Sequence, residues 1–180
     1  DQIYVHDKLM IVDDRVVILG SANINDRSML GHRDSELAIR IEDTLHVPTT
    51  MAGQQFMVGY LPHTVRMQLM RQHLGEDEAL DLSDPLNPAT RDFWTNRSNA
   101  NSAIYDQVDG GISAYRCTTV AQYRDAFANY VNLSYLDPEV KHTMAEIKGF
   151  LVDWPQTLFE KEDLSPPLAT RMVVSNDLWV

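Results

Sequence analysis

Alternation of apolar and polar residues predicts three short strands near the N-terminus. Residues 4–12 are rich in β-branched and aromatic side chains, and residues 15–19 resemble them after the pair Asp13-Asp14. Because aspartate favours turns, the two segments are predicted to form a β-hairpin. Residues 36–42 alternate between polar and apolar side chains, which is typical of a half-buried strand.

The segment between these strands carries turn and capping residues. Gly20 ends the second predicted strand, and residues 21–29 are short and polar. Ser21 or Asn23 is therefore predicted to begin a helix, where free backbone N–H groups also attract anions.

Helical periodicity appears later in the chain. Apolar residues three or four apart predict a helix over residues 64–74, and further helices are predicted over 121–131 and 138–148. Residues 44–62 are predicted to form loop or short structure. The strongly acidic residues 76–92 have no regular ligand spacing, so they are predicted to form a solvated loop and not a metal site.

The alternation of strands and helices indicates an α/β fold. We predict two regions, residues 1–75 and residues 76–180, with the second packing on the first and ending in a tail of mixed strand and loop. The 180 residues suit one domain or one piece of a larger protein. Because the chain begins at Asp1 with no targeting signal, we expect a fragment of a larger chain.

Composition narrows the functional classes. No apolar run approaches the ~20 residues that a membrane-spanning helix requires, so any membrane contact is expected to be peripheral. The single cysteine, Cys117, excludes an internal disulfide framework and favours a reducing compartment. The formal net charge of −11 argues against broad electrostatic binding to nucleic acid or to an anionic membrane.

The residues with the clearest chemistry form one spaced motif. It reads His6-x-Lys8-x4-Asp13-x6-Gly20-Ser21-x-Asn23. Cleavage of a phosphodiester needs a group that attacks phosphorus or protonates the leaving oxygen, and donors that hold the charge on the other oxygens. His6 suits the first task, and Lys8, Ser21 and Asn23 suit the second. Residues two apart in a strand share a face, so His6 and Lys8 are predicted to point into one cleft.

The same chemistry requires a second histidine. A histidine that attacks phosphorus becomes a phosphohistidine, and that ring cannot also protonate the departing alcohol. None of the other five histidines is followed two positions later by lysine; they are His32, His46, His63, His73 and His142. We therefore predict that the chain holds one half of a two-histidine site and that the other half lies elsewhere.

The motif resembles the signature of the phospholipase D superfamily, whose members use two such copies facing each other across a cleft. Residues 20–31 and 33–36 resemble the second, C-terminal copy of fungal and animal phospholipases D, and residues 104–106, 147–152 and 178–180 resemble the region that follows it. This resemblance implies one half of a bilobed α/β fold, with a mixed β-sheet flanked by helices and an irregular C-terminal extension.

The resemblance also implies a role for each motif residue. His6 would be one of two paired catalytic histidines, acting as the general acid toward the leaving alcohol. Glu36 matches the carboxylate that orients the catalytic imidazole, and Asp13 matches a residue that mostly braces the fold. The phosphoryl oxygens would be bound by three donors, Lys8, Ser21 and Asn23. No metal or cofactor is required, and phosphoinositide stimulation is suggested by the resemblance alone.

Three functions remain at this point. The first is hydrolysis of phosphatidylcholine to phosphatidic acid and choline through a phosphohistidine, with transfer to primary alcohols. The second is a nuclease or other phosphodiesterase of the same superfamily, and the third is a non-catalytic module that binds lipid or a partner. For the first, the expected partners are phospholipid at a membrane surface and an N-terminal half with the first motif, without nucleic acid. The expected location is cytoplasmic and peripheral to the membrane.

Overall fold

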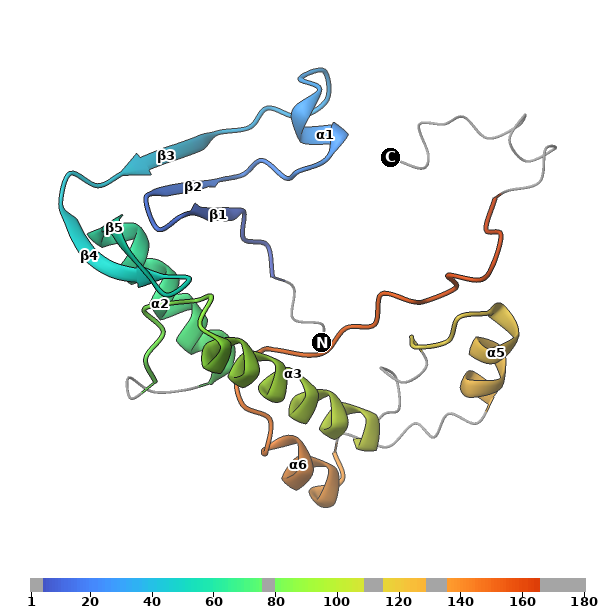
Figure 1. Cartoon of the computed structure of the whole chain (residues 1–180). Coiled ribbons are helices and arrows are strands. Elements are labelled where there is room, and N and C mark those ends of the chain that lie inside the picture. The colour runs from blue at the N-terminus through green and yellow to red at the C-terminus, as the bar shows by residue number, and fades with distance from the viewer. Residues whose placement is uncertain (1–4, 76–79, 109–114, 129–135, 166–180) are drawn as a thin grey trace. The chain divides into compact units, whose positions relative to one another are not determined.

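The computed structural model describes residues 5–75, 80–108, 115–128 and 136–165. It confirms the α/β class, because the described residues contain both small antiparallel sheets and helices, with the strands and the short α1 preceding α2 (Figure 1). The described residues form two compact units. The first comprises residues 5–50 and 54–68, and the second comprises residues 51–53 and 69–165. We describe each unit by itself.

The first unit contains a three-stranded antiparallel sheet in the order β1-β2-β3, which includes the predicted hairpin. Its strands are β1 (Leu9–Val12), β2 (Val16–Gly20) and β3 (Ala38–Glu42). Asp13 and Asp14 both have a positive φ in the turn between β1 and β2, which aspartate tolerates better than most residues do. β1 is shorter than predicted because β2, its partner, ends at Gly20 opposite Lys8.

A second hairpin occupies the segment that was predicted as loop or short structure. It consists of β4 (His46–Met51) and β5 (Gln54–Gly59), joined at Ala52 and Gly53, which both have a positive φ. The alternation in β4 leaves its even positions exposed and its odd positions half-buried. Pro48 and two threonines in β4 weaken that signal in the sequence, which explains why the hairpin was not predicted.

Helix α2 (Tyr60–Leu74) begins four residues before the predicted start. Its first turn contains Pro62, which a helix accepts there because the first N–H groups have no partner within the helix. Asp43 supplies an acceptor in their place, since its Oδ2 lies 2.8 Å from the backbone nitrogen of Leu61. Gly75 follows with a φ of 66°, so the predicted C-terminal stop is confirmed.

Helix α3 (Pro88–Val108) was not predicted, and its first residues overlap the predicted acidic loop. Several of its buried positions are polar, which removes the apolar periodicity that identifies a helix: Thr90, Asn101 and Ser102. The prediction of a solvated loop is also wrong for Asp84, which is 7% exposed and accepts hydrogen bonds from the backbone of Ala52 and Gly53. Glu76, Asp77 and Glu78 lie outside the described residues.

Two shorter helices confirm the remaining periodic segments. They are α5 (Val120–Ala128) and α6 (Pro138–Met144), and the predicted end of the first lies outside the described residues. α6 is capped by Asp137, whose side chain accepts from the backbone nitrogen of Glu139 at 2.8 Å. α6 ends before the predicted residue 148, in a series of turns that leads to Gly149. The described residues 145–165 contain no strand, so the predicted strand character is absent from this part of the tail.

Candidate active site

His6 and Lys8 lie in the segment that leads into β1 and not within the strand. The Nζ of Lys8 donates a hydrogen bond of 2.7 Å to the backbone oxygen of His6. The backbone nitrogen of Gly20 donates to the backbone oxygen of Lys8 at 3.1 Å. Strand periodicity therefore does not govern this pair, and backbone hydrogen bonds hold Lys8 beside the end of β2.

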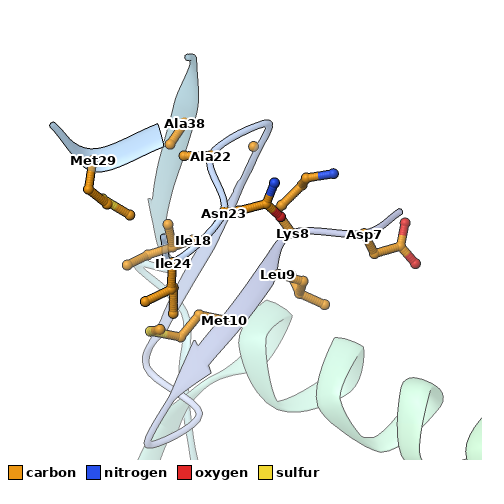
Figure 2. A pocket seen from close by; sticks show the side chains of 11 residues that line it. Asp7, Lys8, Leu9, Met10, Ile18, Ala22, Asn23, Ile24, Met29 and Ala38 are labelled. Atoms are coloured by element: carbon orange, nitrogen blue, oxygen red, sulfur yellow. The ribbon is translucent and has the colours of Figure 1, made fainter. Parts of the chain in front are cut away.

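Lys8 lines a cavity of about 390 Å³ on this sheet. Its polar lining consists of Asp7, Lys8 and Asn23. The apolar part comes from the sheet, from the loop after β2 and from α1 (Asp26–Met29), and includes Met10, Ile18, Ile24 and Met29. Figure 2 shows these apolar side chains gathered beside the polar end that Lys8 and Asn23 form. The cavity therefore pairs an aspartate, a lysine and an asparagine with an apolar wall.

The carboxylate of Glu36 is held by two serine hydroxyls. The Oγ of Ser21 donates to Oε2 of Glu36 at 2.6 Å, and the Oγ of Ser28 donates to Oε1 at 2.6 Å. The backbone nitrogen of Leu37 also donates to Oγ of Ser21 at 3.1 Å. Both oxygens of the carboxylate are therefore engaged, which fixes its plane.

These contacts keep Glu36 ionised. Hydrogen bonds from Ser21 and then Ser28 lower the pKa of the Glu36 carboxyl, and the positive charge of Lys8 lowers it further. Partial burial and the negative charge of Asp34 oppose this shift in pKa without reversing it. Glu36 thus has the charge that a partner of an imidazolium needs. The predicted contact of Glu36 with His6 stays a prediction.

Ser21 and Asn23 have different surroundings, although both were predicted to bind phosphate. A serine hydroxyl has one proton, and that of Ser21 is directed to Glu36. Asn23 lines the cavity with its side chain, while its backbone nitrogen donates to Oγ of Ser28 at 3.1 Å. Neither residue begins the helix as predicted. The N-cap of α1 is Asn25, whose side chain accepts from the backbone nitrogen of Ser28.

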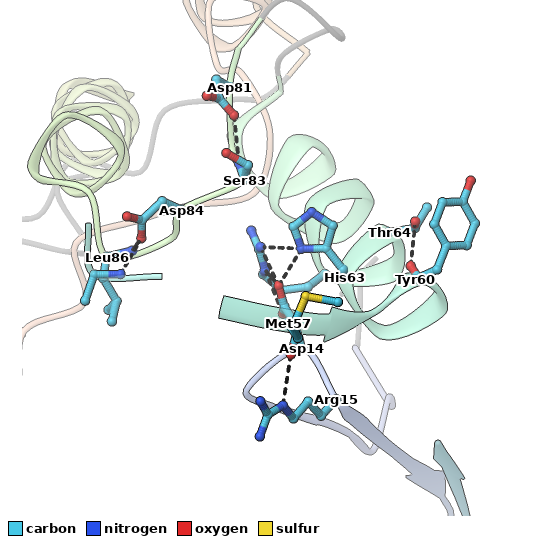
Figure 3. Close-up of polar contacts among 12 residues, drawn as sticks. Asp14, Arg15, Met57, Tyr60, His63, Thr64, Asp81, Ser83, Asp84 and Leu86 are labelled. Atoms are coloured by element: carbon cyan, nitrogen blue, oxygen red, sulfur yellow. Dashed lines mark hydrogen bonds and ion pairs between the residues drawn. The ribbon is translucent and has the colours of Figure 1, made fainter. Parts of the chain in front are cut away.

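Asp13 and its neighbour Asp14 have opposite environments. Asp13 is exposed on the turn, whereas Asp14 is 3% exposed and is bound by side chains from α2. His63 Nδ1 lies 2.7 Å from Oδ2 of Asp14 (Figure 3), and Nη2 of Arg66 lies 2.6 Å from the same oxygen. The carboxylate that braces the sheet against α2 is therefore that of Asp14. The spacing of these residues in sequence offers no signal that they meet.

The side chains around Asp14 favour its ionised form over its protonated form. Burial raises the pKa of Asp14, but hydrogen bonds from Arg66 and His63 and the charge of Arg66 outweigh burial and lower that pKa overall. Asp14 therefore stays negative beside the cationic Arg66.

Two further properties concern only the part of the chain that the structure describes. No group of three or more His, Cys, Asp or Glu side chains within it could hold a metal ion. None of its helices combines the length and the apolar character needed to cross a bilayer.

Comparison with known proteins identifies relatives that match nearly the whole chain. Residues 1–109 match the family model described as phospholipase D. Human Phospholipase D1 is 38% identical over 182 residues, which cover 98% of this chain and 17% of the relative. Phospholipase D B of Dictyostelium discoideum is 38% identical over 91% of this chain and 13% of its own length. Phospholipase D zeta 2 of Arabidopsis thaliana is 36% identical over 92% of this chain and 18% of its own length. The chain thus spans less than a fifth of each of these relatives.

Proposed function

The chain belongs to the phospholipase D family, and we propose that it supplies one of two catalytic half-sites for the hydrolysis of phosphatidylcholine. The products would be phosphatidic acid and choline. The other half-site would come from an N-terminal half of the same protein that carries the first His-x-Lys-x4-Asp copy. We call a protein that contains both halves the two-copy protein.

The observation that carries the choice of substrate is the composition of the cavity. Lys8 and Asn23 offer donors to a phosphate, and the apolar side chains beside them offer a surface to the glycerol and acyl parts of a lipid. A nucleic acid has no comparable apolar portion next to its phosphodiester. The net charge of −11 also opposes binding of a polyanion. Both features favour phospholipid over the nuclease alternative.

The proposed reaction has two steps. In the first, the histidine of the first copy attacks phosphorus, and the phosphorus–oxygen bond to choline breaks as His6 donates a proton to the choline oxygen. In the second, His6 takes a proton from water, the resulting hydroxide attacks phosphorus, and the phosphorus–nitrogen bond breaks, which releases phosphatidic acid and regenerates the histidine of the first copy. A primary alcohol can replace water, so transfer to alcohols follows from the same route.

The remaining residues act on charge and orientation in this proposal. Lys8 and Asn23 donate to the non-bridging oxygens as their charge grows. Glu36 orients the imidazole of His6 and stabilises its protonated form. Ser21 acts through Glu36, to which its hydroxyl proton is directed. Asp13 contributes to the turn that precedes β2.

The proposed setting is a membrane surface on the cytoplasmic side, to which the protein binds peripherally. The proposal uses no metal or cofactor. The proposal includes stimulation by phosphoinositides, and the resemblance to the family is the only support for it.

The test is synthesis of phosphatidylbutanol from phosphatidylcholine and 1-butanol by the two-copy protein. We expect wild type to form it and His6→Ala to lose it while remaining folded, with His32→Ala as a control because His32 is also exposed. Butanol transfer by a folded His6→Ala variant would contradict the role of His6. Cleavage of DNA with no turnover of phosphatidylcholine would favour the nuclease.

A further inference from the structure

Ser28 is the second donor to Glu36 and lies outside the spaced motif that runs from His6 to Asn23. It lies in α1, is half-buried, and stands eight residues before the carboxylate that it contacts. Ser21 and Ser28 donate to different oxygens of Glu36, each at 2.6 Å. A carboxylate held at both oxygens cannot rotate about its final bond without losing a hydrogen bond.

The orientation of Ser28 is itself determined by its neighbours. Its backbone nitrogen donates to Oδ1 of Asn25 at 3.0 Å, which places it in the first turn of α1. Its hydroxyl oxygen accepts from the backbone nitrogen of Asn23 at 3.1 Å while its proton goes to Glu36. A serine hydroxyl has one proton and two lone pairs, so these contacts are compatible. One hydroxyl therefore ties the loop that carries Asn23 to the carboxylate.

We propose that Ser28 is a positioning residue for phosphodiester cleavage, holding Glu36 and the backbone of Asn23 in the geometry that the reaction needs. This inference rests on the proposed function, because it assigns Ser28 to the same site. Ser28 acts through Glu36 and Asn23.

The charges around Glu36 define what loss of Ser28 does. Lys8 favours the ionised carboxylate, Asp34 opposes it, and Arg27 interacts with it as a cation. Ser28 is the second donor that lowers the pKa of Glu36, after Ser21. Removal of its hydroxyl therefore raises that pKa towards its ordinary value. Because the ionised form is the working form, activity then disappears at a higher pH as the solution is acidified.

The experiment compares Ser28→Ala, Ser28→Thr and Ser35→Ala in the two-copy protein. Ser35 is an exposed serine next to Glu36 and is the matched control. We measure kcat/KM against pH with two substrates, phosphatidylcholine in vesicles and a soluble 4-nitrophenyl phosphodiester. For Ser28→Ala we expect the acid limb to move to higher pH and the maximum to fall about tenfold on both substrates. Ser28→Thr, which keeps a hydroxyl, is expected to restore the wild-type limb, and Ser35→Ala to leave it unchanged.

Each outcome bears on the inference. An acid limb that is the same in folded Ser28→Ala and wild type would overturn it. If Ser28→Ala does not fold, Ser28→Cys replaces it in the experiment, because cysteine has nearly the same shape as serine and is a weaker donor. The acid limb of Ser28→Cys must then move to higher pH as well. A wild-type protein that cleaves the soluble diester but not phosphatidylcholine would refute the proposed substrate. The comparison of Ser28→Ala with wild type on the soluble diester would then still decide the role of Ser28. A wild-type protein that cleaves neither diester would refute both proposals.

Discussion

The carboxylate of Asp14 lies 2.7 Å from Nδ1 of His63, although the two residues are 49 positions apart in sequence. Arg66 completes the group from the next turn of α2. This contact links the turn between β1 and β2 to α2.

Asp14→Asn is expected to destabilise the first unit strongly. It removes the buried negative charge to which His63 and Arg66 bind, and removal of one partner from a buried ion pair typically costs about 3 kcal/mol or more. Hydrogen exchange of the two-copy protein should show about a hundredfold faster exchange at the backbone nitrogen of Gly59, which donates to the backbone oxygen of Asp14. The exposed Asp13→Asn is the matched control, and equal effects of the two variants would contradict this assignment.

The same group predicts an acid limit to stability. The pKa of Asp14 is lower in the folded protein than in the unfolded chain, so its contribution is complete above the unfolded pKa of about 4 and is lost as the pH falls through the folded pKa. Protection of Gly59, corrected for intrinsic exchange, should therefore decline below about pH 4 in wild type. The decline should be shallower in Asp14→Asn, and parallel curves would show that other carboxyls control this limit.

Gly20 is expected to tolerate no side chain. A Cβ at this position would lie 2.3 Å from the backbone oxygen of Leu37 and 2.7 Å from Cα of Ala38, so β3 would have to move away from β2. Gly20→Ala should cost about 1–3 kcal/mol and displace Glu36, which directly precedes Leu37. We expect faster hydrogen exchange in β3 together with a loss of butanol transfer.

Gly31→Ala is the control for Gly20→Ala, because it introduces backbone strain without a steric clash. Gly31 has a φ of 73°, but a Cβ there meets no atom within 4 Å. Its cost should be limited to about 1 kcal/mol, which a left-handed residue other than glycine incurs. A Gly20→Ala variant that behaves like Gly31→Ala would show that β3 can move without consequence for the site.

Met29→Glu tests the apolar wall of the cavity. The substitution places a charge where the proposal puts the apolar part of the lipid. We expect kcat/KM for phosphatidylcholine vesicles to fall about tenfold or more, since burial of a methionine side chain is worth about 1.5–3 kcal/mol. Turnover of the soluble 4-nitrophenyl phosphodiester should change little.

Leu30→Glu is the control for this variant. Leu30 adjoins Met29 and is similarly exposed, at 61% against 59%, but it does not line the cavity. Equal losses in the two variants would point to general membrane contact and not to the cavity.

Asn101 is expected to be essential for the second unit. Its side chain donates to the backbone oxygens of Lys148 and Leu151, each at 2.8 Å, and accepts from the backbone nitrogen of Lys148. Asn101→Leu has a similar volume but leaves these backbone groups unpaired, at a cost on the order of 3 kcal/mol. Exchange in residues 148–152 should accelerate, whereas the exposed Asn99→Ala on the same helix should have little effect.

Local patterns in the sequence predicted elements whose stabilising features lie close together in the chain. The Asp13-Asp14 turn, the strands on either side of it and the C-terminal stop at Gly75 are all found in the structure. The second hairpin and α3 were not predicted. β4 contains Pro48, and α3 buries polar side chains such as Asn101, so neither shows a clean apolar repeat.

The sequence by itself determined the chemistry available to this protein: a histidine, a lysine and a carboxylate at the spacing of the phospholipase D family. Only the tertiary structure decided how those groups are used. It directs the proton of Ser21 to Glu36, adds Ser28 as a second donor, and buries Asp14 in place of Asp13. The physical reason is that residue type and spacing set which groups can donate or accept. The partner each group finds depends on the approach of β3, α1 and α2 from distant parts of the chain.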